Sequence, residues 1–317
     1  MALRERRPDI ARRLSFVVVT DTTATIARLL AALRSQTIRS EIELVVVCGT
    51  AGELGLTDAD VDGIGAVRVV EVGDILPLHE ATAAGVREAG APVLVIGETH
   101  AFPDPEALEI VLDCFGDESV GAVAPGLRNA NPSPASWGSL MVTYGRALGP
   151  EAREVDTISS HNVAVRRDLL IGLGDDLAFR LALGGGLGET LRSRGYRLRY
   201  EPAVVFAHLN VARLKSCFLD RFHASRIYAS GRSSGWGAGR RALFVAGAPL
   251  VPAVLCWKVA HSPGWSQHKP EFGWAIWPSI VVSVASMAAG EAFAYVSGPG
   301  PSFERVADYE VHRERHL

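Results

Sequence analysis

The 317-residue sequence has few cysteines, few lysines and little net charge. Its four cysteines lie far apart and form no CxxC pair, so neither a disulfide framework nor a zinc site is expected. Basic and acidic residues number 32 and 35, which excludes a polycationic chain and, with it, nucleic acid as the expected partner. No Walker loop occurs either. What remains is a globular chain, 48% apolar and long enough for one large domain or two ordinary ones.

The N-terminus lacks the apolar segment of a signal peptide. Residues 1–13 are basic and lead directly into a strand-like segment, so we expect no export and a reducing, cytoplasmic compartment. The mean hydropathy of +0.17 is nevertheless high for a soluble protein. The apolar residues responsible for it are concentrated in the last third of the chain.

Between residues 14 and 125, short apolar runs alternate with amphipathic stretches. Strands are predicted over 14–19, 43–47, 67–72 and 92–96, and helices over 26–33 and 80–89. A further helix is predicted with Asp104 as its cap, Pro105 as its first residue and an apolar stripe that ends at Phe115. Such alternation is typical of βα units. The predicted fold class is therefore α/β, with a largely parallel sheet flanked by helices.

Polar side chains follow the predicted strands at the edge where a parallel sheet usually binds its ligand. Thr20 and Asp21 follow the first strand, Cys48 ends the second, and Glu98 and His100 follow the fourth. A carboxylate and an imidazole two residues apart at a strand end point the same way and suit a divalent metal or a metal–diphosphate complex. The spacing also allows a plainer interpretation, in which Glu98 caps a loop and His100 is a surface histidine.

Two later segments carry further polar groups. His161 and Asn162 precede a short strand that ends in Arg166 and Arg167, and this arginine pair opens a helix. Residues 195–208 supply two more strand-like pieces that finish at His208. A single histidine at a strand end is more often structural than a ligand, so His208 alone defines no site.

Together these segments resemble the family 2 glycosyltransferases, which have the nucleotide-sugar-binding, Rossmann-like GT-A fold. The first strand and turn of the family correspond to residues 17–22, and its Gln-Thr pair to Gln36 and Thr37. Its Asp-x-Asp metal motif falls on the Gly-Glu-Thr-His segment 97–100, which continues Ala-Phe-Pro as in a divergent subgroup of the family. The family's acceptor-side Gly-Asn-x-x-x-Arg-Arg segment resembles residues 161–167.

The resemblance implies a GT-A-like domain over residues 1–212 that binds a nucleotide sugar. The residues that it places at the donor are Thr20, Asp21, Cys48, Glu98, His161 and Asn162. The residues that it places at a divalent metal, Mn²⁺ or Mg²⁺, are Glu98, His100 and His208. In an inverting transfer of this kind, a carboxylate takes the proton of the attacking acceptor hydroxyl, and the metal neutralises the leaving diphosphate.

Three places depart from the family pattern. Cys48 replaces an aspartate that contacts the nucleobase, and Thr82 and Ala83 replace an Arg-Asn pair. The Glu-Asp pair that supplies the general base corresponds to residues 183–188, which contain no acid. Glu189 is then the expected catalytic base, although it equally suits the first turn of a helix. Without a base, catalysis loses a factor of about 10²–10⁴, so a degenerate transferase is the alternative.

From residue 213 the sequence becomes first basic and then apolar. Residues 213–241 hold seven basic side chains against one acid, and uncharged runs follow over 243–257 and 273–290. Five of the six tryptophans lie in this part, as is typical of membrane interfaces. Both runs fall short of the ~20 residues of a span. We therefore expect residues 213–317 to form an apolar helical region, interfacial or re-entrant at the cytoplasmic face of the membrane. A buried helical subdomain or a dimer interface is the alternative.

The sequence thus predicts a metal-dependent glycosyltransferase that moves a sugar from a nucleotide-sugar donor to a lipid-linked or natural-product acceptor. The expected partners are the nucleotide sugar, an unidentified acceptor, a membrane surface and, in a homo-oligomer, further copies of the chain. The alternative is a catalytically degenerate relative that acts as a membrane-associated binding or partner module.

Overall fold

The computed structural model describes residues 12–317, so the prediction that the chain has no signal peptide falls almost wholly outside the described residues. The chain divides into two compact units. Of the described residues, the first contains 12–128 and 151–207, and the second contains 129–150 and 208–317. The predicted boundary at residue 212 stays a prediction.

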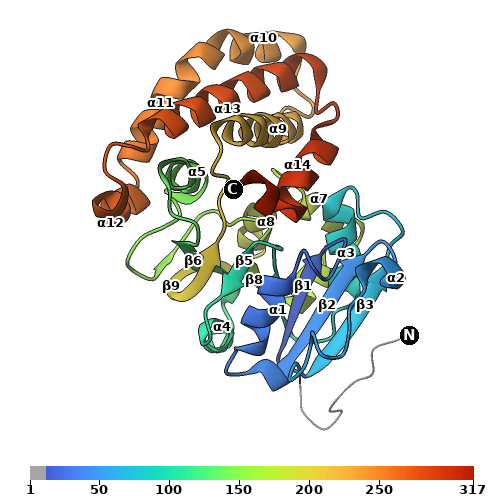
Figure 1. Cartoon of the computed structure of the whole chain (residues 1–317). Helices are drawn as coiled ribbons and strands as arrows, with labels where there is room; N and C mark the ends of the chain where they lie inside the picture. The colour runs from blue at the N-terminus through green and yellow to red at the C-terminus, as the bar shows by residue number, and fades with distance from the viewer. Residues whose placement is uncertain (1–11) are drawn as a thin grey trace. The chain divides into compact units, whose positions relative to one another are not determined.

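The first unit is built on one sheet, to which the described residues contribute nine strands (Figure 1). Their order is β3-β2-β1-β4-β8-β6-β9-β5, with β7 paired to β9. The strands are β1 (Leu14–Val19), β2 (Ile42–Cys48), β3 (Ala66–Glu71), β4 (Val93–Ile96), β5 (Ala101–Pro103), β6 (Val120–Asn129), β7 (Arg153–Glu154), β8 (Val163–Arg166) and β9 (Arg197–His208). Strands β6 and β9 each end on a residue of the second unit.

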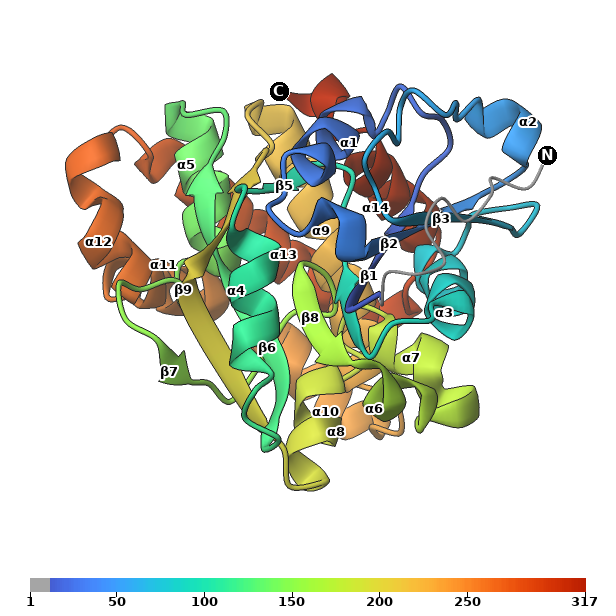
Figure 2. The same ribbon diagram turned by 90° about the horizontal axis from the view of Figure 1, so that it is seen from below.

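Helices cover the sheet (Figure 2). Its central strands β1, β2 and β4 are therefore buried along their whole length. Helix α3 (Leu78–Glu88) packs on β1 and β2, and there Gly85 lets the backbone approach: a Cβ would lie 2.6 Å from Val47 and 2.7 Å from Val17. The other helices of this unit are α1 (Ala27–Arg34), α2 (Ala51–Leu54), α4 (Ala107–Cys114), α6 (Arg167–Ile171), α7 (Leu177–Leu181), α8 (Leu187–Ser193), η1 (Arg39–Glu41) and η2 (Gly174–Asp176). The predicted α/β class with a largely parallel sheet is confirmed.

Two local predictions were wrong. Helix α4 begins at Ala107 and not at Pro105, because Asp104 does not cap it: its Oδ1 accepts a hydrogen bond from Arg128 Nη2 at 2.6 Å. The two strand pieces expected over 195–208 are the single strand β9. Pro202 fits inside that strand because it lies opposite Gly126, where a Cβ would come within 2.9 Å of the Pro202 carbonyl oxygen.

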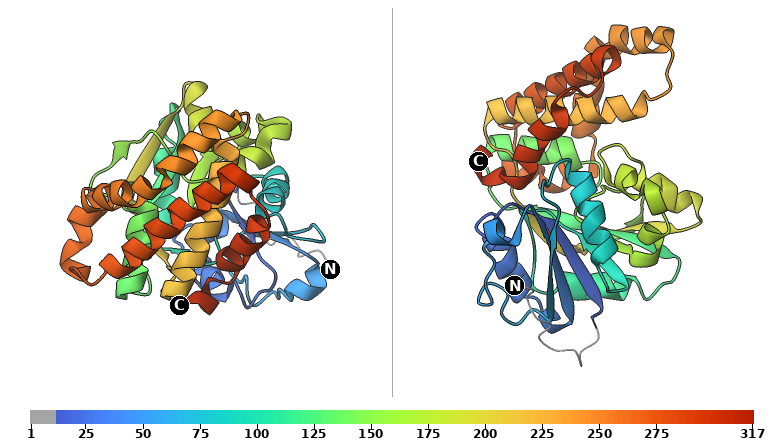
Figure 3. Two further views of the ribbon diagram at one scale, coloured as in Figure 1. Left: turned by 90° about the horizontal axis from the view of Figure 1, so that it is seen from above. Right: turned by 90° about the vertical axis from the view of Figure 1, so that its right-hand side faces the viewer.

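The second unit is helical, as predicted for the C-terminal region. Helix α13 lies along α9 and also contacts α5, α10 and α11 (Figure 3). Small residues let α13 and α9 approach closely. At Gly290 of α13, a Cβ would lie only 2.2 Å from the Phe222 carbonyl oxygen of α9. The elements are α5 (Pro134–Tyr144), α9 (Leu214–Arg232), α10 (Ala238–Gly247), η3 (Ala248–Leu250), α11 (Val251–Ala260), α12 (Pro263–Phe272), α13 (Trp277–Ser297), α14 (Ser302–Val311) and η4 (Arg313–His316).

Two helical stretches of this unit, Ala238–Ala260 and Trp277–Ser297, are long and apolar enough to cross a membrane. Length and composition are the whole of that criterion, which the buried core helix of a soluble protein also meets. The helical runs are longer than the uncharged runs of the sequence, because α10 and α13 include flanking small and charged residues.

Candidate active site at the carboxyl edge of the sheet

The strand directions gather the predicted site residues at one edge of the sheet. Strands β3, β2, β1 and β4 run parallel, so Cys48 at the end of β2 and Asp21 and Glu98 after β1 and β4 lie at the same edge. Strand β8 runs antiparallel to β4, with Val163 opposite Ile96. The residue before Val163 is Asn162, which therefore emerges at that same edge.

The Glu98 carboxylate is the centre of this edge. It is buried, with His100 Nε2 at 3.4 Å from its Oε2 and His161 Nε2 at 3.3 Å from its Oε1. Asn162 Nδ2 donates a hydrogen bond to Oε2. Asn162 has a positive φ of 48°, so the backbone turns sharply where its side chain meets the carboxylate. The structure thus brings together Glu98, His100, His161 and Asn162, and the plainer interpretation of His100 as a surface histidine was wrong.

Gly97 lets Glu98 take this position. A Cβ on Gly97 would lie 2.2 Å from Cε1 of Phe16, a fully buried ring in β1. Only glycine therefore allows the chain to leave β4 directly over that ring. The strand exit and the core beneath it are packed as one piece.

The segment after the site is held by the Gln36-Thr37 pair. Gln36 Nε2 donates to the carbonyl oxygens of Pro103 at 3.2 Å and Asp104 at 2.9 Å. Gln36 Oε1 accepts from the Leu108 backbone at 3.2 Å. This buried amide joins the end of α1 to β5 and α4, which explains what the pair contributes to the fold.

Glu98 and His100 are placed as two ligands of one ion would be. Ligand atoms about 2.1 Å from a metal, at angles between about 90° and 109°, lie about 3.0–3.4 Å apart. The distance between Glu98 Oε2 and His100 Nε2 is 3.4 Å. A mixed set of carboxylate and imidazole suits Mn²⁺ better than Mg²⁺, which prefers oxygen ligands.

A hydrogen bond within its own unit fixes the tautomer of His208, whose role as a metal ligand stays a prediction. It is the last residue of β9, which neighbours β5, and its Nδ1 lies 3.0 Å from Asn210 Oδ1. The Asn210 amide nitrogen donates to Asn129 Oδ1 at 3.1 Å, which assigns the atom that faces His208 as an oxygen. His208 Nδ1 therefore carries the proton and Nε2 keeps the lone pair that binds metals.

Thr20 and Asp21 build the turn after β1. Asp21 Oδ1 accepts from the Thr22 backbone and from Thr25 Oγ1, each at 2.7 Å. Thr20 is buried, and its hydroxyl donates to the Thr22 carbonyl oxygen at 3.1 Å. These bonds order the entry to α1, and contact with a donor stays a prediction for both residues.

Cys48 ends β2 as a buried, neutral thiol. Burial raises its pKa, and the negative charges of Glu71 and Glu53 raise the pKa further. Glu71 lies directly opposite Cys48 in the β2–β3 register, and its Oε1 accepts from the Ala51 backbone at 2.6 Å. Glu71 thus supplies, on the neighbouring strand, the carboxylate that is missing at position 48. The sequence did not predict this placement, although Glu71 is the acidic residue within the apolar run 67–72.

Glu189 is exposed in the first turn of α8. That position is favourable for a carboxylate because of the positive end of the helix dipole. Among residues 12–317, no described contact joins Glu189 to Glu98. Its role as catalytic base stays a prediction.

Comparison with solved structures identifies the fold. Mannosyltransferase PcManGT from Pyrobaculum calidifontis, in complex with GDP-Man and Mn²⁺, is similar over 92% of this chain and 88% of that chain, with 19% identity and a TM-score of 0.58. S. aureus TarS 1–349 is similar with 11% identity and a TM-score of 0.49, over 96% of this chain and 92% of that one. The same TarS fragment with UDP-GlcNAc gives 14% identity and a TM-score of 0.48, over 96% and 93%.

No protein-family model and no curated protein matches the sequence. The likeness to the mannosyltransferase structure, at 19% identity, establishes the fold. The chain has the α/β, GT-A-like fold of glycosyltransferases, as the resemblance of its motifs implied.

Proposed function

We propose that this chain is a metal-dependent glycosyltransferase that moves a sugar from a nucleotide-sugar donor to an acceptor hydroxyl. One observation carries the proposal: a buried Glu98 carboxylate, in contact with His100, His161 and Asn162, lies at the ligand-binding edge of the sheet. The mannosyltransferase of similar fold was solved with GDP-Man and Mn²⁺, which supports a nucleotide sugar and a divalent metal here.

The metal would be held by Glu98 and His100, two buried side chains of the sheet unit that each offer one ligand atom. A role for His208 as a further ligand stays a prediction. When bound, the ion supplies positive charge that neutralises the leaving diphosphate. Asn162 fixes the orientation of the Glu98 carboxylate by its hydrogen bond. His161, which contacts the other carboxylate oxygen, lies where it can donate a hydrogen bond to the donor phosphates.

The nucleoside would lie over the ends of β1, β2 and β3. Thr20 and Asp21 would contact it from the turn after β1. Cys48 cannot supply charge at neutral pH because the pKa of its thiol is raised. Glu71 is placed to accept a hydrogen bond from a ring N–H of uracil or guanine in place of the missing aspartate.

The acceptor half of the reaction rests on Glu189. As catalytic base, this residue would take the proton of a hydroxyl on a lipid-linked or natural-product acceptor. Glu189 is exposed at the start of α8. To act as the base, its carboxylate would have to come within hydrogen-bond distance of the acceptor hydroxyl when the acceptor binds.

The test is a panel of nucleotide sugars, including GDP-mannose and UDP-N-acetylglucosamine, with Mn²⁺. Calorimetry measures binding, and release of nucleoside diphosphate measures turnover. We expect the wild type to bind one donor in the presence of Mn²⁺ and Glu98→Gln to lose that binding, while the exposed control Glu106→Gln keeps it. Absence of both binding and turnover in the wild type overturns the proposal.

The second candidate function is a catalytically degenerate binding module. It is favoured by the acid-free segment 183–188 and by the exposed position of Glu189. Donor binding that depends on Glu98 but is never followed by diphosphate release, with any acceptor supplied, would identify this function.

A further inference from the structure

We propose that α10, η3 and α11 together form an interfacial helix that lies flat on an anionic lipid bilayer, and that α13 does not cross it. This inference does not rest on glycosyl transfer, because it concerns the helical unit alone. It decides between the interfacial and spanning arrangements that the sequence leaves open.

The first observation is a row of exposed apolar side chains on one face of this helical stretch. Leu243, Leu250, Val254 and Trp257 are 69%, 71%, 49% and 62% exposed. Their spacing of seven, four and three residues places them on one side of a helix. Only 11% of the most apolar window in Ala238–Ala260 is buried, against 50% in Trp277–Ser297. The row thus places four large, exposed apolar side chains along one side of the same helical stretch.

The opposite face of the same stretch is already occupied. Val245 packs against the cluster of Ala229, Ala294 and Tyr295, and Arg241 Nη1 donates to the Tyr295 carbonyl oxygen at 3.5 Å. One side of the stretch is therefore used for packing on α13, and the side that carries the exposed row is open. A helix that is half covered by protein and apolar on its open side is suited to a lipid surface there.

The second observation is charge. No acidic residue occurs between Asp220 and Glu271. Two basic residues of that stretch, Arg221 and Arg232, form ion pairs with Asp220 and Glu291. The others are Arg226, Arg240, Arg241, Lys258 and Lys269. Basic residues beside an apolar surface bind anionic lipid headgroups. The charge of this stretch is thus complementary to an anionic bilayer.

Tryptophan–cation pairs lie at both ends of the apolar row. Near its start, the Arg240 guanidinium lies 4.0 Å from the Trp236 ring centroid. Beyond its end, Lys269 Nζ lies 5.6 Å from the Trp274 ring. Tryptophan and basic residues prefer the headgroup level of a bilayer. If both ends and the row between them lie at that level, the helix is parallel to the membrane plane.

Helix α13 is excluded from the hydrocarbon because α9 lies along it (Figure 3). Ser286 of α13 donates its hydroxyl to the Phe218 carbonyl oxygen, and Gly290 touches the Phe222 backbone. A membrane that contained α13 would have to contain the same stretch of α9.

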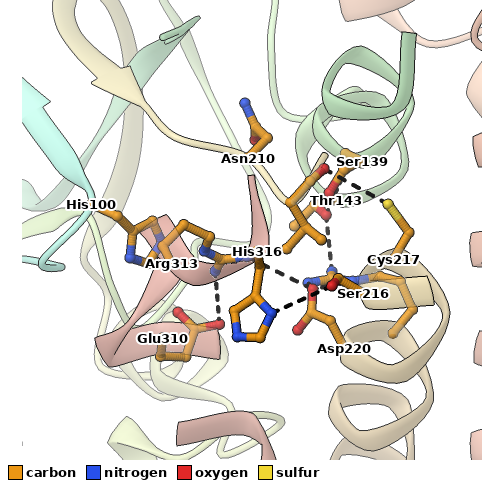
Figure 4. Close-up of polar contacts among 12 residues, drawn as sticks. His100, Ser139, Thr143, Asn210, Ser216, Cys217, Asp220, Glu310, Arg313 and His316 are labelled. Atoms are coloured by element: carbon orange, nitrogen blue, oxygen red, sulfur yellow. Dashed lines mark hydrogen bonds and ion pairs between the residues drawn. The ribbon is translucent and has the colours of Figure 1, made fainter. Parts of the chain in front are cut away.

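That stretch of α9 carries charges committed to protein contacts (Figure 4). Asp220 is fully buried and accepts from Arg221 Nε at 3.0 Å, while Arg313 Nη1 lies 3.8 Å away. Arg313 also contacts Glu310 at 3.1 Å, and Ser216 lies 3.3 Å from His316 Nδ1, so the network holds the C-terminal segment on α9. Moving these ionised groups of α9 into hydrocarbon would be strongly unfavourable. Helix α13 is therefore kept out of the hydrocarbon by its contacts with α9, although Val281, Phe293 and Val296 are 50%, 57% and 76% exposed.

A bilayer fits the exposed row better than a second copy does. In a symmetric dimer, the same face meets itself, so Arg240 and Lys258 of each copy would approach the basic residues of the other. No acid in residues 221–270 could pair with them. Like charges across such an interface are unfavourable, whereas lipid phosphates would neutralise them.

Flotation of the full chain with lipid vesicles tests the surface. Vesicles of phosphatidylcholine with about 30% phosphatidylglycerol should bind the protein, and pure phosphatidylcholine should bind it more weakly. Leu250→Ser and Trp257→Ser should each weaken binding by about tenfold, and Arg240→Glu by about tenfold on anionic vesicles only. The matched controls are Phe179→Ser, a 54% exposed aromatic of the sheet unit, and Arg87→Glu, which should change nothing.

Depth measurements test the geometry. Single cysteines at positions 243, 250 and 257, in a Cys256→Ser background, would carry a fluorophore that doxyl-labelled lipids quench. The other cysteines, Cys48, Cys114 and Cys217, are buried. We expect the same shallow depth at all three positions. A deep maximum at position 250 would show a span and overturn the interfacial arrangement.

Two other outcomes also contradict the proposal. Vesicle binding that the Leu250→Ser and Trp257→Ser variants leave unchanged would assign the membrane contact to another surface. Absence of vesicle binding, together with a dimer in analytical ultracentrifugation that Leu250→Ser dissociates, would show that a second copy covers the row. Circular dichroism of each variant shows that its fold is retained.

Discussion

The two units differ in how they divide side chains between interior and surface. In the sheet unit, the largest fully buried side chains are apolar, such as Phe16, Phe206 and Leu108. In the helical unit, α13 buries Ser279, Ser283 and Ser286 at 2% exposure or less, while Leu250 and Trp257 are exposed. The sheet unit follows the usual rule for water-soluble domains. The helical unit departs from it most clearly along the stretch from α10 to α11, where Leu243, Leu250 and Trp257 are 69%, 71% and 62% exposed, which marks a surface suited to a second solvent.

The two units also differ in where they place charge. The sheet unit collects polar groups at the carboxyl edge of parallel strands, where Glu98 is buried among partners. The helical unit buries charge as ion pairs, of which Asp220 with Arg313 and Arg221 is the deepest group. A buried carboxylate that contacts two histidines is suited to an ion, whereas one neutralised by arginines is suited to a structural role. The comparison therefore supports placing the proposed metal site in the sheet unit.

The largest effects are expected at the Glu98 cluster. His100→Ala removes a proposed metal ligand and should lower turnover by about 10³-fold, since the lost charge stabilisation is several kcal/mol. Asn162→Ala leaves the ligands in place but frees the carboxylate, and should cost about 10–100-fold in Mn²⁺ affinity. Calorimetry with Mn²⁺ and a donor assay measure both. Equal, small effects of the two changes would mean that the cluster is structural.

Leucine truncation compares the two surfaces directly. Leu108→Ala removes a fully buried side chain of α4 and should lower the free energy of unfolding by about 2–5 kcal/mol. Leu250→Ala, at a 71% exposed position, should change it by no more than about 0.5 kcal/mol without lipid. Urea denaturation measures both. A large loss for Leu250→Ala would mean that protein, in a second copy, already covers the apolar row.

Glycine substitution tests how closely the helices of the second unit approach. Gly290→Ala would place a Cβ 2.2 Å from the Phe222 backbone and should cost about 1–3 kcal/mol of stability. Gly231→Ala, in α9, meets no atom within 4 Å and should be neutral or stabilising by up to about 1 kcal/mol. If thermal unfolding of the two variants is indistinguishable, α9 and α13 do not pack as described.

The smallest effect is a pH dependence at a buried thiol of the helical unit. Burial raises the pKa of Cys217 to about 11. Below pH 9 the thiol is protonated in both states, but between pH 9 and pH 11 it ionises only in the unfolded chain. Stability should therefore fall as the pH rises, by about 1.4 kcal/mol per unit at most. Urea denaturation at pH 9 and 10 should show a steeper loss for the wild type than for Cys217→Ala. Parallel losses would place the thiol in water.

The sheet could be predicted because strands buried on both faces appear as continuous apolar runs, as in 42–48 and 93–96. Glu98 and His100 could be predicted because they follow such a run directly. Glu71 was missed because its position opposite Cys48 depends on strand register, which the sequence does not show. The start of α4 was missed because Arg128, distant in sequence, takes the carboxylate of Asp104 away from the helix.

The central claim, that Glu98 and His100 bind a divalent metal for a nucleotide-sugar donor, is tested most directly by anomalous diffraction. Crystals grown with Mn²⁺ and a donor that the chain binds should show a manganese peak within about 2.3 Å of Glu98 Oε2 and His100 Nε2. The same experiment on Glu98→Gln should show none at that place. A manganese peak on other side chains, or a bound donor with no metal near Glu98, would contradict the account.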